Sequence, residues 1–126
     1  MRVFKTKLFN RRAKGMGLSD EALLKAIKEM LQGLYEANLG GNIYKKRVPL
    51  GGRGKSGGAR TIVAFKMQDK AIFLYGFSKN ERGNINKKEE EVFKELGDDF
   101  LNFSDKQINE AVKTGILIEV KNETMH

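Results

Sequence analysis

The spacing of hydrophobic residues changes along the chain, from a helical repeat near the N-terminus to alternating and continuous apolar runs in the middle. Ser19 is suited to cap a helix, and acidic residues follow it in the positive first turn. The spacing predicts an amphipathic helix that ends near Gly33. Its core-facing stripe consists of Leu23, Ile27, Met30, Leu31 and Leu34. Before it, RVFKT at residues 2–6 predicts a strand, followed by a short helix that ends near Gly15 and Gly17.

The middle of the chain contains three strand-like runs, at residues 42–50, 59–67 and 71–79. The first run alternates, so Tyr44 and Lys46 are expected on one face and Lys45 and Arg47 on the other. The other two runs are apolar on both faces and are joined by a few polar residues, which predicts an antiparallel hairpin. Helices are expected to cover one side of this sheet.

The C-terminal third is predicted to be helical. Asn86-x-x-Glu89 and Ser104-x-x-Gln107 have the spacing of capping boxes, and a helix is expected to end near Gly115. Residues 116–120 form a short β-branched run that is expected to be an edge strand. The predicted order is β-α-α-β-β-β-α-α-β, which is typical of an α+β fold.

The missing residue types limit the chemistry. The 126 residues suffice for one domain with a small core, but they include no cysteine, and the single histidine is His126. A disulfide framework, thiol catalysis, a Ser-His-Asp triad and a cysteine or histidine zinc site are therefore excluded. No metal or other cofactor is expected. No apolar run approaches the roughly 20 residues that span a bilayer, and no secretory signal is evident, so a cytoplasmic protein is expected.

The positive charge is concentrated in the first two thirds of the chain. The net charge is +8, and residues 1–82 hold 18 Lys and Arg against 6 Asp and Glu, whereas residues 83–126 hold 6 against 10. A basic half favours a polyanionic partner, because each neutralised phosphate releases counterions. Charge alone is equally consistent with a basic face that only aids solubility.

The segment GGRGKSGGAR at residues 51–60 superficially matches a nucleotide-binding P-loop. Pro49 stands where that motif requires its first glycine, and a strand follows instead of a helix, so nucleotide binding is disfavoured. The segment is better interpreted as a hairpin loop whose backbone N–H groups contact a nucleic-acid backbone, together with Arg53, Lys55 and Arg60. The alternative is a loop whose charges only aid solubility.

Three segments together resemble the RelE/HigB group of bacterial type II toxins: YKKRV, GRGKSGGARTIVAFK and FLYGFSKNER. The tail FSDKQINEAVKTGILIEV is similar to the C-terminal extension of one branch of that group. The resemblance covers about residues 42–120. It implies a small α+β fold, an antiparallel twisted sheet with helices packed on one face. A single domain over residues 1–126 is expected, with a helical and short-strand extension at about 98–126.

The resemblance also implies a function. Members of this group are metal-independent endoribonucleases that cut mRNA, usually on the ribosome, and each is inhibited by a cognate antitoxin, often a helix-turn-helix protein. DNA is then contacted only through the toxin–antitoxin complex, and the protein acts in the bacterial cytoplasm. Such enzymes cleave RNA with clustered Lys and Arg and sometimes Tyr, which suits a chain whose only histidine is terminal.

The residues that match the group's site fall into two sets. The catalytic set implied by the resemblance is Lys45, Arg47, Arg60, Lys79 and Arg82. The substrate-binding set is Lys46, Arg53, Lys55, Tyr75, Phe77 and Asn80. Asn80 replaces an arginine found in RelE itself, and RelE has a tyrosine near the position of Asn86. The general acid is therefore left unassigned. Strand alternation places Phe73, Tyr75, Phe77 and Lys79 on one face, with Phe77 available to stack on a base. Glu81 is expected to orient Arg82 or Arg60.

Two other functions remain open. The related ParE toxins share the fold but inhibit DNA gyrase and lack the basic catalytic set. A non-catalytic RNA-binding protein fits the composition equally well. A helix-turn-helix repressor is disfavoured, because the basic residues cluster on strands and a loop instead of a recognition helix.

Overall fold

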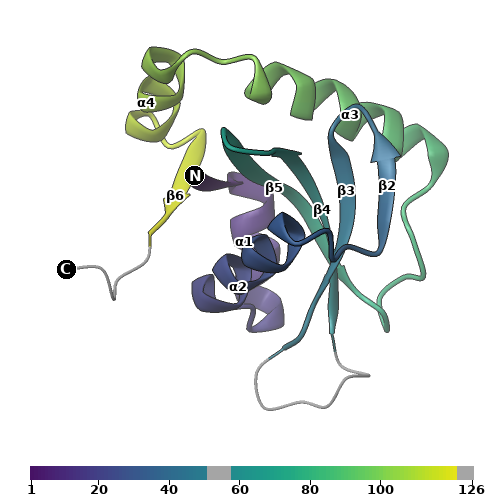
Figure 1. The fold of residues 1–126 in the computed structure, drawn as a ribbon. Helices are drawn as coiled ribbons and strands as arrows, with labels where there is room; N and C mark the ends of the chain where they lie inside the picture. The colour runs from purple at the N-terminus through teal and green to yellow at the C-terminus, as the bar shows by residue number, and fades with distance from the viewer. Residues whose placement is uncertain (51–57, 122–126) are drawn as a thin grey trace.

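The structure, a computed structural model, describes residues 1–50 and 58–121. In this part of the chain, four helices accompany one six-stranded sheet (Figure 1). The elements are β1 (Arg2–Thr6), α1 (Lys7–Met16), α2 (Asp20–Leu31), β2 (Ala37–Gly40), β3 (Ile43–Val48), β4 (Ala59–Lys66), β5 (Lys70–Ser78), α3 (Lys87–Leu101), α4 (Asp105–Lys113) and β6 (Leu117–Val120). The α+β class predicted from the sequence is therefore confirmed.

The sheet has the strand order β2-β3-β4-β5-β1-β6. Neighbouring strands are antiparallel except β1 and β5, which pair in parallel, so the predicted antiparallel sheet is confirmed apart from this one pair. The parallel pair arises because β1 enters the sheet beside β5 instead of at its edge, and β6 then pairs with the free side of β1. The prediction that residues 116–120 form an edge strand is confirmed.

Helices cover both faces of the sheet, so the prediction of one covered face is wrong. On one face, α1 and α2 pack with Val63 and Phe73; on the other, α3 and α4 pack with Ile62 and Leu74. The reason is visible in the sequence: β4 and β5 are apolar on both faces, and each face must be removed from water. Figure 1 shows α3 across the sheet from α1 and α2. We call the two sides the α2 face and the α3 face.

The predicted helix caps are confirmed. The side chain of Ser19 accepts a hydrogen bond from the backbone of α2, and Asn86 and Ser104 form complete capping boxes with the residues three positions later. Two ion pairs further attach α2 to the sheet, Lys5 to Asp20 at 2.7 Å and Lys46 to Glu29 at 2.8 Å.

The sequence pattern does not predict β2. Its four residues, ANLG, lack an apolar alternation, and their register with β3 shifts between Asn38 and Gly40. Gly40, Gly41 and Asn42 all have positive φ, and the resulting turn returns the chain to β3. This short edge strand matters because Glu36 immediately precedes it.

A β-bulge in β5 changes which side chains share a face. Ile62 pairs with Tyr75 and Val63 with Phe73, so Leu74 is an extra residue on β5. Phe73 therefore lies on the α2 face and Phe77 on the α3 face. The prediction that Phe73 and Phe77 share one face is wrong, because alternation alone does not reveal a bulge. None of the helices in the described part of the chain has the length and apolar character to cross a membrane.

Candidate functional site

Two rows of side chains cross the α3 face near the ends of β3 and β5. The register aligns Arg47 on β3 with Arg60 on β4 and Phe77 on β5; the next row aligns Lys45, Ile62 and Tyr75. Directly opposed residues of an antiparallel pair have Cβ atoms about 5 Å apart on one face, where like charges are unfavourable. The pairing of Arg47 with Arg60 is therefore suited to an anion that bridges both.

Arg60 is held by an acidic partner. Its Nε lies 3.1 Å from Oε1 and 3.0 Å from Oε2 of Glu36, and its side chain is only 16% exposed. Glu36 is itself fixed, because its backbone N–H donates to the carbonyl of Lys45 at 2.8 Å. Sequence reasoning missed Glu36, since it precedes the strand that the pattern did not predict.

Arg47 is exposed at the end of the same row. A Cβ atom on Gly58 would lie 3.2 Å from the Nε of Arg47, so the absence of a side chain at Gly58 makes room for this arginine. No ion pair to Arg47 occurs within residues 1–50 and 58–121.

Arg82 is fixed beside Tyr75 by a carboxylate. Its two terminal nitrogens donate to Glu89 at 2.6 and 2.8 Å, and Nη1 also lies 3.4 Å from the hydroxyl oxygen of Tyr75. The hydrogen bonds to Glu89 and then to Tyr75 raise the pKa of Arg82, and Arg82 lowers the pKa of Glu89. Because the tyrosine oxygen accepts from Arg82, its own O–H stays available to donate.

Arg12 is a further cation at the site that sequence reasoning did not assign. Its Nε donates to the carbonyl of Gly76 at 2.5 Å, and its guanidinium lies 4.8 Å from the centre of the Tyr75 ring. Arg12 also pairs with Glu81 and lowers the pKa of that carboxyl. The expectation that Glu81 would orient Arg82 or Arg60 is wrong, because Glu81 pairs with Arg12 instead. Arg12 can reach Glu81 because β1 pairs with β5 only as far as Phe73, which leaves the edge of β5 beyond Phe73 open to α1.

The two predicted aromatic residues present no open ring face. Phe77 is fully buried, which corrects the expectation that it stacks on a base. The Tyr75 ring contacts Arg12 and also stacks on Phe93 at 5.2 Å with an interplanar angle of 21°. The hydroxyl group is therefore the part of Tyr75 suited to chemistry.

The remaining predicted residues lie elsewhere or outside the described part. Lys46 is buried on the α2 face with Glu29, away from Lys45 and Arg47, as strand alternation predicts. Lys79 and Asn80 are exposed in the turn that follows β5. Arg53 and Lys55 lie outside the described residues.

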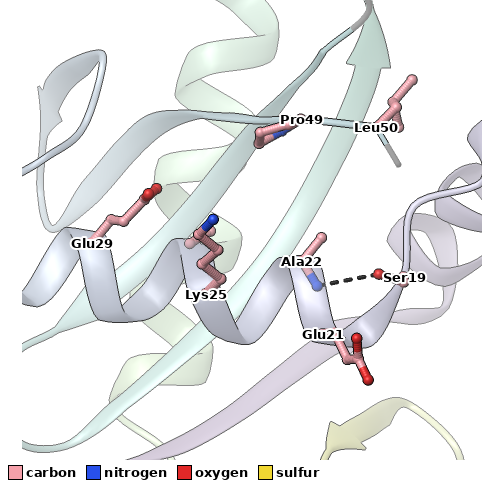
Figure 2. A pocket seen from close by; sticks show the side chains of 8 residues that line it. Ser19, Glu21, Ala22, Lys25, Glu29, Pro49 and Leu50 are labelled. Carbon is pink, nitrogen blue, oxygen red and sulfur yellow. Dashed lines mark hydrogen bonds between the residues drawn. The ribbon is translucent and has the colours of Figure 1, made fainter. Parts of the chain in front are cut away.

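A cavity of about 300 Å³ lies on the opposite, α2 face. Figure 2 shows it between Pro49 and Leu50 on one side and Lys25 and Ala22 of α2 on the other. Among the described residues that line it, Lys25 is accompanied by the carboxylates of Glu21 and Glu29, so these residues do not concentrate positive charge. The basic rows on the α3 face are consequently the better candidate for a polyanion.

Further basic side chains lie on α1, the helix that carries Arg12. Lys7, Arg11 and Lys14 are exposed at a spacing that places them along one stripe of the helix, and α1 contains no acidic residue. Together with Arg12, this helix extends the positive surface beyond the sheet. No group of three or more His, Cys, Asp or Glu that could hold a metal ion occurs in the described ranges.

Comparison with known proteins gives one family. The family model described as "RelE toxin of RelE / RelB toxin-antitoxin system" matches residues 1–120, which includes every described element. No curated protein matches the chain significantly.

Proposed function

Because the chain belongs to the RelE toxin family of toxin–antitoxin systems, we propose that it is an endoribonuclease that cleaves mRNA on the ribosome. The observation that carries this proposal is the pairing of Arg47 with Arg60 on one face of the sheet. Two opposed cations are unfavourable in the isolated protein and are compensated when a phosphate lies between them. A gyrase inhibitor does not cleave RNA, so its function does not require two arginines placed to bind one phosphate.

The reaction requires no metal and no water. The 2′-hydroxyl of a nucleotide attacks the adjacent phosphorus and gives its proton to a base. The bond from phosphorus to the 5′-oxygen then breaks, and that oxygen receives a proton from an acid. The products are a 2′,3′-cyclic phosphate and a 5′-hydroxyl end. Fixed cations stabilise the charge that develops on the phosphate oxygens.

The arginines are assigned to charge stabilisation. Arg60 and Arg47 bind the scissile phosphate, since an arginine keeps its charge and offers a planar fork of donors. Lys79, exposed after β5, binds a neighbouring phosphate. Arg82 acts through Tyr75, whose hydroxyl oxygen accepts its hydrogen bond.

Lys45 and Tyr75 are assigned to proton transfer. They lie in the same row with Ile62 between them, so their strands are about 10 Å apart. In-line displacement needs the proton acceptor and donor on opposite sides of the phosphorus. Lys45 is assigned as the acceptor for the 2′-hydroxyl proton, a role that requires its uncharged amine form because an ammonium group has no acceptor, and Tyr75 is assigned as the donor to the 5′-oxygen.

The family supplies the partner class. A toxin of this family has an antitoxin partner, which we propose to be a helix-turn-helix protein. We further propose that the chain acts in the bacterial cytoplasm as one domain, with residues 98–126 as a C-terminal extension.

The proposal is tested with purified protein and ribosomes that translate a defined mRNA. We expect fragments with 5′-hydroxyl ends inside the coding sequence, and no fragments with R60A. Binding of RNA without cleavage would instead indicate a non-catalytic RNA-binding protein.

A further inference from the structure

Glu36 contacts Arg60 in a way that leaves part of the guanidinium available. Both carboxylate oxygens lie about 3 Å from Nε of Arg60, at 3.0 and 3.1 Å. Within the described residues, no hydrogen bond engages the two terminal nitrogens of Arg60. The carboxylate therefore occupies the inner edge of the guanidinium, and the outer edge keeps its donors.

The backbone of Glu36 also makes its position definite. Its N–H donates to the carbonyl of Lys45 at 2.8 Å, and β2 continues from Ala37 beside β3. Glu36 is thus tied to the strand that carries Lys45 and Arg47. Arg60 faces Arg47 across β3 and β4, and without Glu36 the repulsion between the two guanidinium groups would favour other rotamers of Arg60.

We propose that Glu36 is a positioning residue that holds Arg60 by Nε and directs its terminal nitrogens toward an RNA phosphate. The inference rests on the proposed function for the identity of the ligand. The positioning role predicts the opposite change in RNA affinity from the one that charge repulsion alone predicts. Removal of an acidic residue beside an RNA site normally strengthens binding, whereas removal of Glu36 weakens it. The competing view, that Glu36 occupies the phosphate position and competes with RNA, predicts stronger binding.

The variants separate the hydrogen bond from the charge. E36A removes both, whereas E36Q removes the charge but retains a carbonyl oxygen that can accept from Nε. R60A and the double variant E36A/R60A measure how far the two residues act as one unit. E29A is the matched control, because Glu29 is also an ion-paired acid but lies with Lys46 on the opposite face.

Two measurements apply to each variant, in addition to the cleavage assay with translating ribosomes described above. The first is the affinity for a short single-stranded RNA across a range of salt concentrations, by fluorescence anisotropy. The second is the ¹⁵Nε–Hε NMR signal of Arg60, identified by its loss in R60A, which reports the order of that side chain without RNA. Thermal unfolding confirms that each variant is folded.

We expect E36A to bind RNA roughly tenfold more weakly, the order of a lost hydrogen bond to a charged group. The slope of log affinity against log salt should fall by about 0.7, one phosphate contact on a single strand. R60A and E36A/R60A should be equally weak. E36Q and E29A should bind at least as well as the wild type. The Arg60 signal should be ordered in wild type and E36Q and averaged in E36A.

Different outcomes overturn different claims. Wild-type or stronger binding by E36A, with R60A weakened, would overturn the positioning role and leave RNA binding intact. Retained binding with lost cleavage in E36Q would overturn it also, because Glu36 would then be the proton acceptor. An ordered Arg60 signal that depends on Glu36, in a protein that does not bind RNA, would support the positioning role and contradict the proposed function.

Discussion

Arg47 and Arg60 lie directly opposite each other on β3 and β4, so two arginines share one face at neighbouring positions. Of these two arginines, only Arg60 has an acidic partner in the described part of the chain. R47A should therefore leave the free energy of unfolding unchanged or slightly higher, because it removes repulsion without breaking an ion pair. Its RNA affinity should fall, with a salt slope reduced by about 0.7. Urea unfolding and anisotropy titrations measure the two effects; a destabilised R47A that binds RNA normally would contradict this account of the pair.

Tyr75 is expected to contribute its hydroxyl and not its ring. Y75F keeps the contacts with Arg12 and Phe93 but removes the oxygen that accepts from Arg82. The single-turnover cleavage rate should fall by about 10²- to 10⁴-fold, the range for a general acid, while RNA affinity is unchanged. Y44F is the control, because Tyr44 packs on the α2 face. Full activity of Y75F would remove Tyr75 from proton transfer.

Glu89 is expected to make stability depend on pH. Because Arg82 lowers the pKa of Glu89 in the folded protein, the pair stabilises the fold above the pKa of the unfolded chain. This contribution is lost as the pH falls through the lower folded pKa. E89A should therefore be less stable than the wild type at pH 7, and the difference should shrink below about pH 4.

Chemical unfolding at several pH values checks this prediction. E91A is its control, since Glu91 is exposed on the same helix and forms no ion pair within the described ranges. A difference between E89A and the wild type that stays constant from pH 7 to pH 3 would show that the carboxylate charge is not the cause.

Gly97 allows α3 to approach the sheet closely. A Cβ atom at this position would lie 2.4 Å from Cδ1 of Ile43 and 3.1 Å from Cβ of Ala64. G97A should therefore destabilise the fold by about 1–3 kcal/mol, the usual cost of overpacking. In G15A the new Cβ meets no atom within 4 Å, so the better helix propensity of alanine should stabilise α1 by up to about 1 kcal/mol. Thermal denaturation of the two variants should shift the midpoint in opposite directions.

The local signals in the sequence predicted most elements, whereas long-range pairing could not be predicted. Ser19, Asn86 and Ser104 act as caps because a cap depends on residues only three positions apart. Because β4 and β5 are apolar on both faces, the sequence already indicated that helices must cover both sides of the sheet. Helices on one side only were predicted. The bulge at Leu74 has no signature in the alternation, and it decides which face Tyr75 and Phe77 share.

The residues of the candidate site show the same division between local and long-range signals. Arg47 and Arg60 belong to segments with a recognisable pattern, and the register brings them together. Glu36 and Arg12 belong to segments without such a pattern, and they reach the site only through the edge strand β2 and the open edge of β5. Their spacing from the other site residues, 24 positions in the case of Glu36 and Arg60, carries no signal in one sequence.

The most direct test of the central claim is the mapping of mRNA 5′ ends in bacterial cells after induced expression of the chain. We predict new ends inside translated codons with the wild type. R60A and K79A should abolish these ends, although both variants remain folded. Intact mRNA together with arrested DNA replication would contradict the ribonuclease account and favour a gyrase inhibitor.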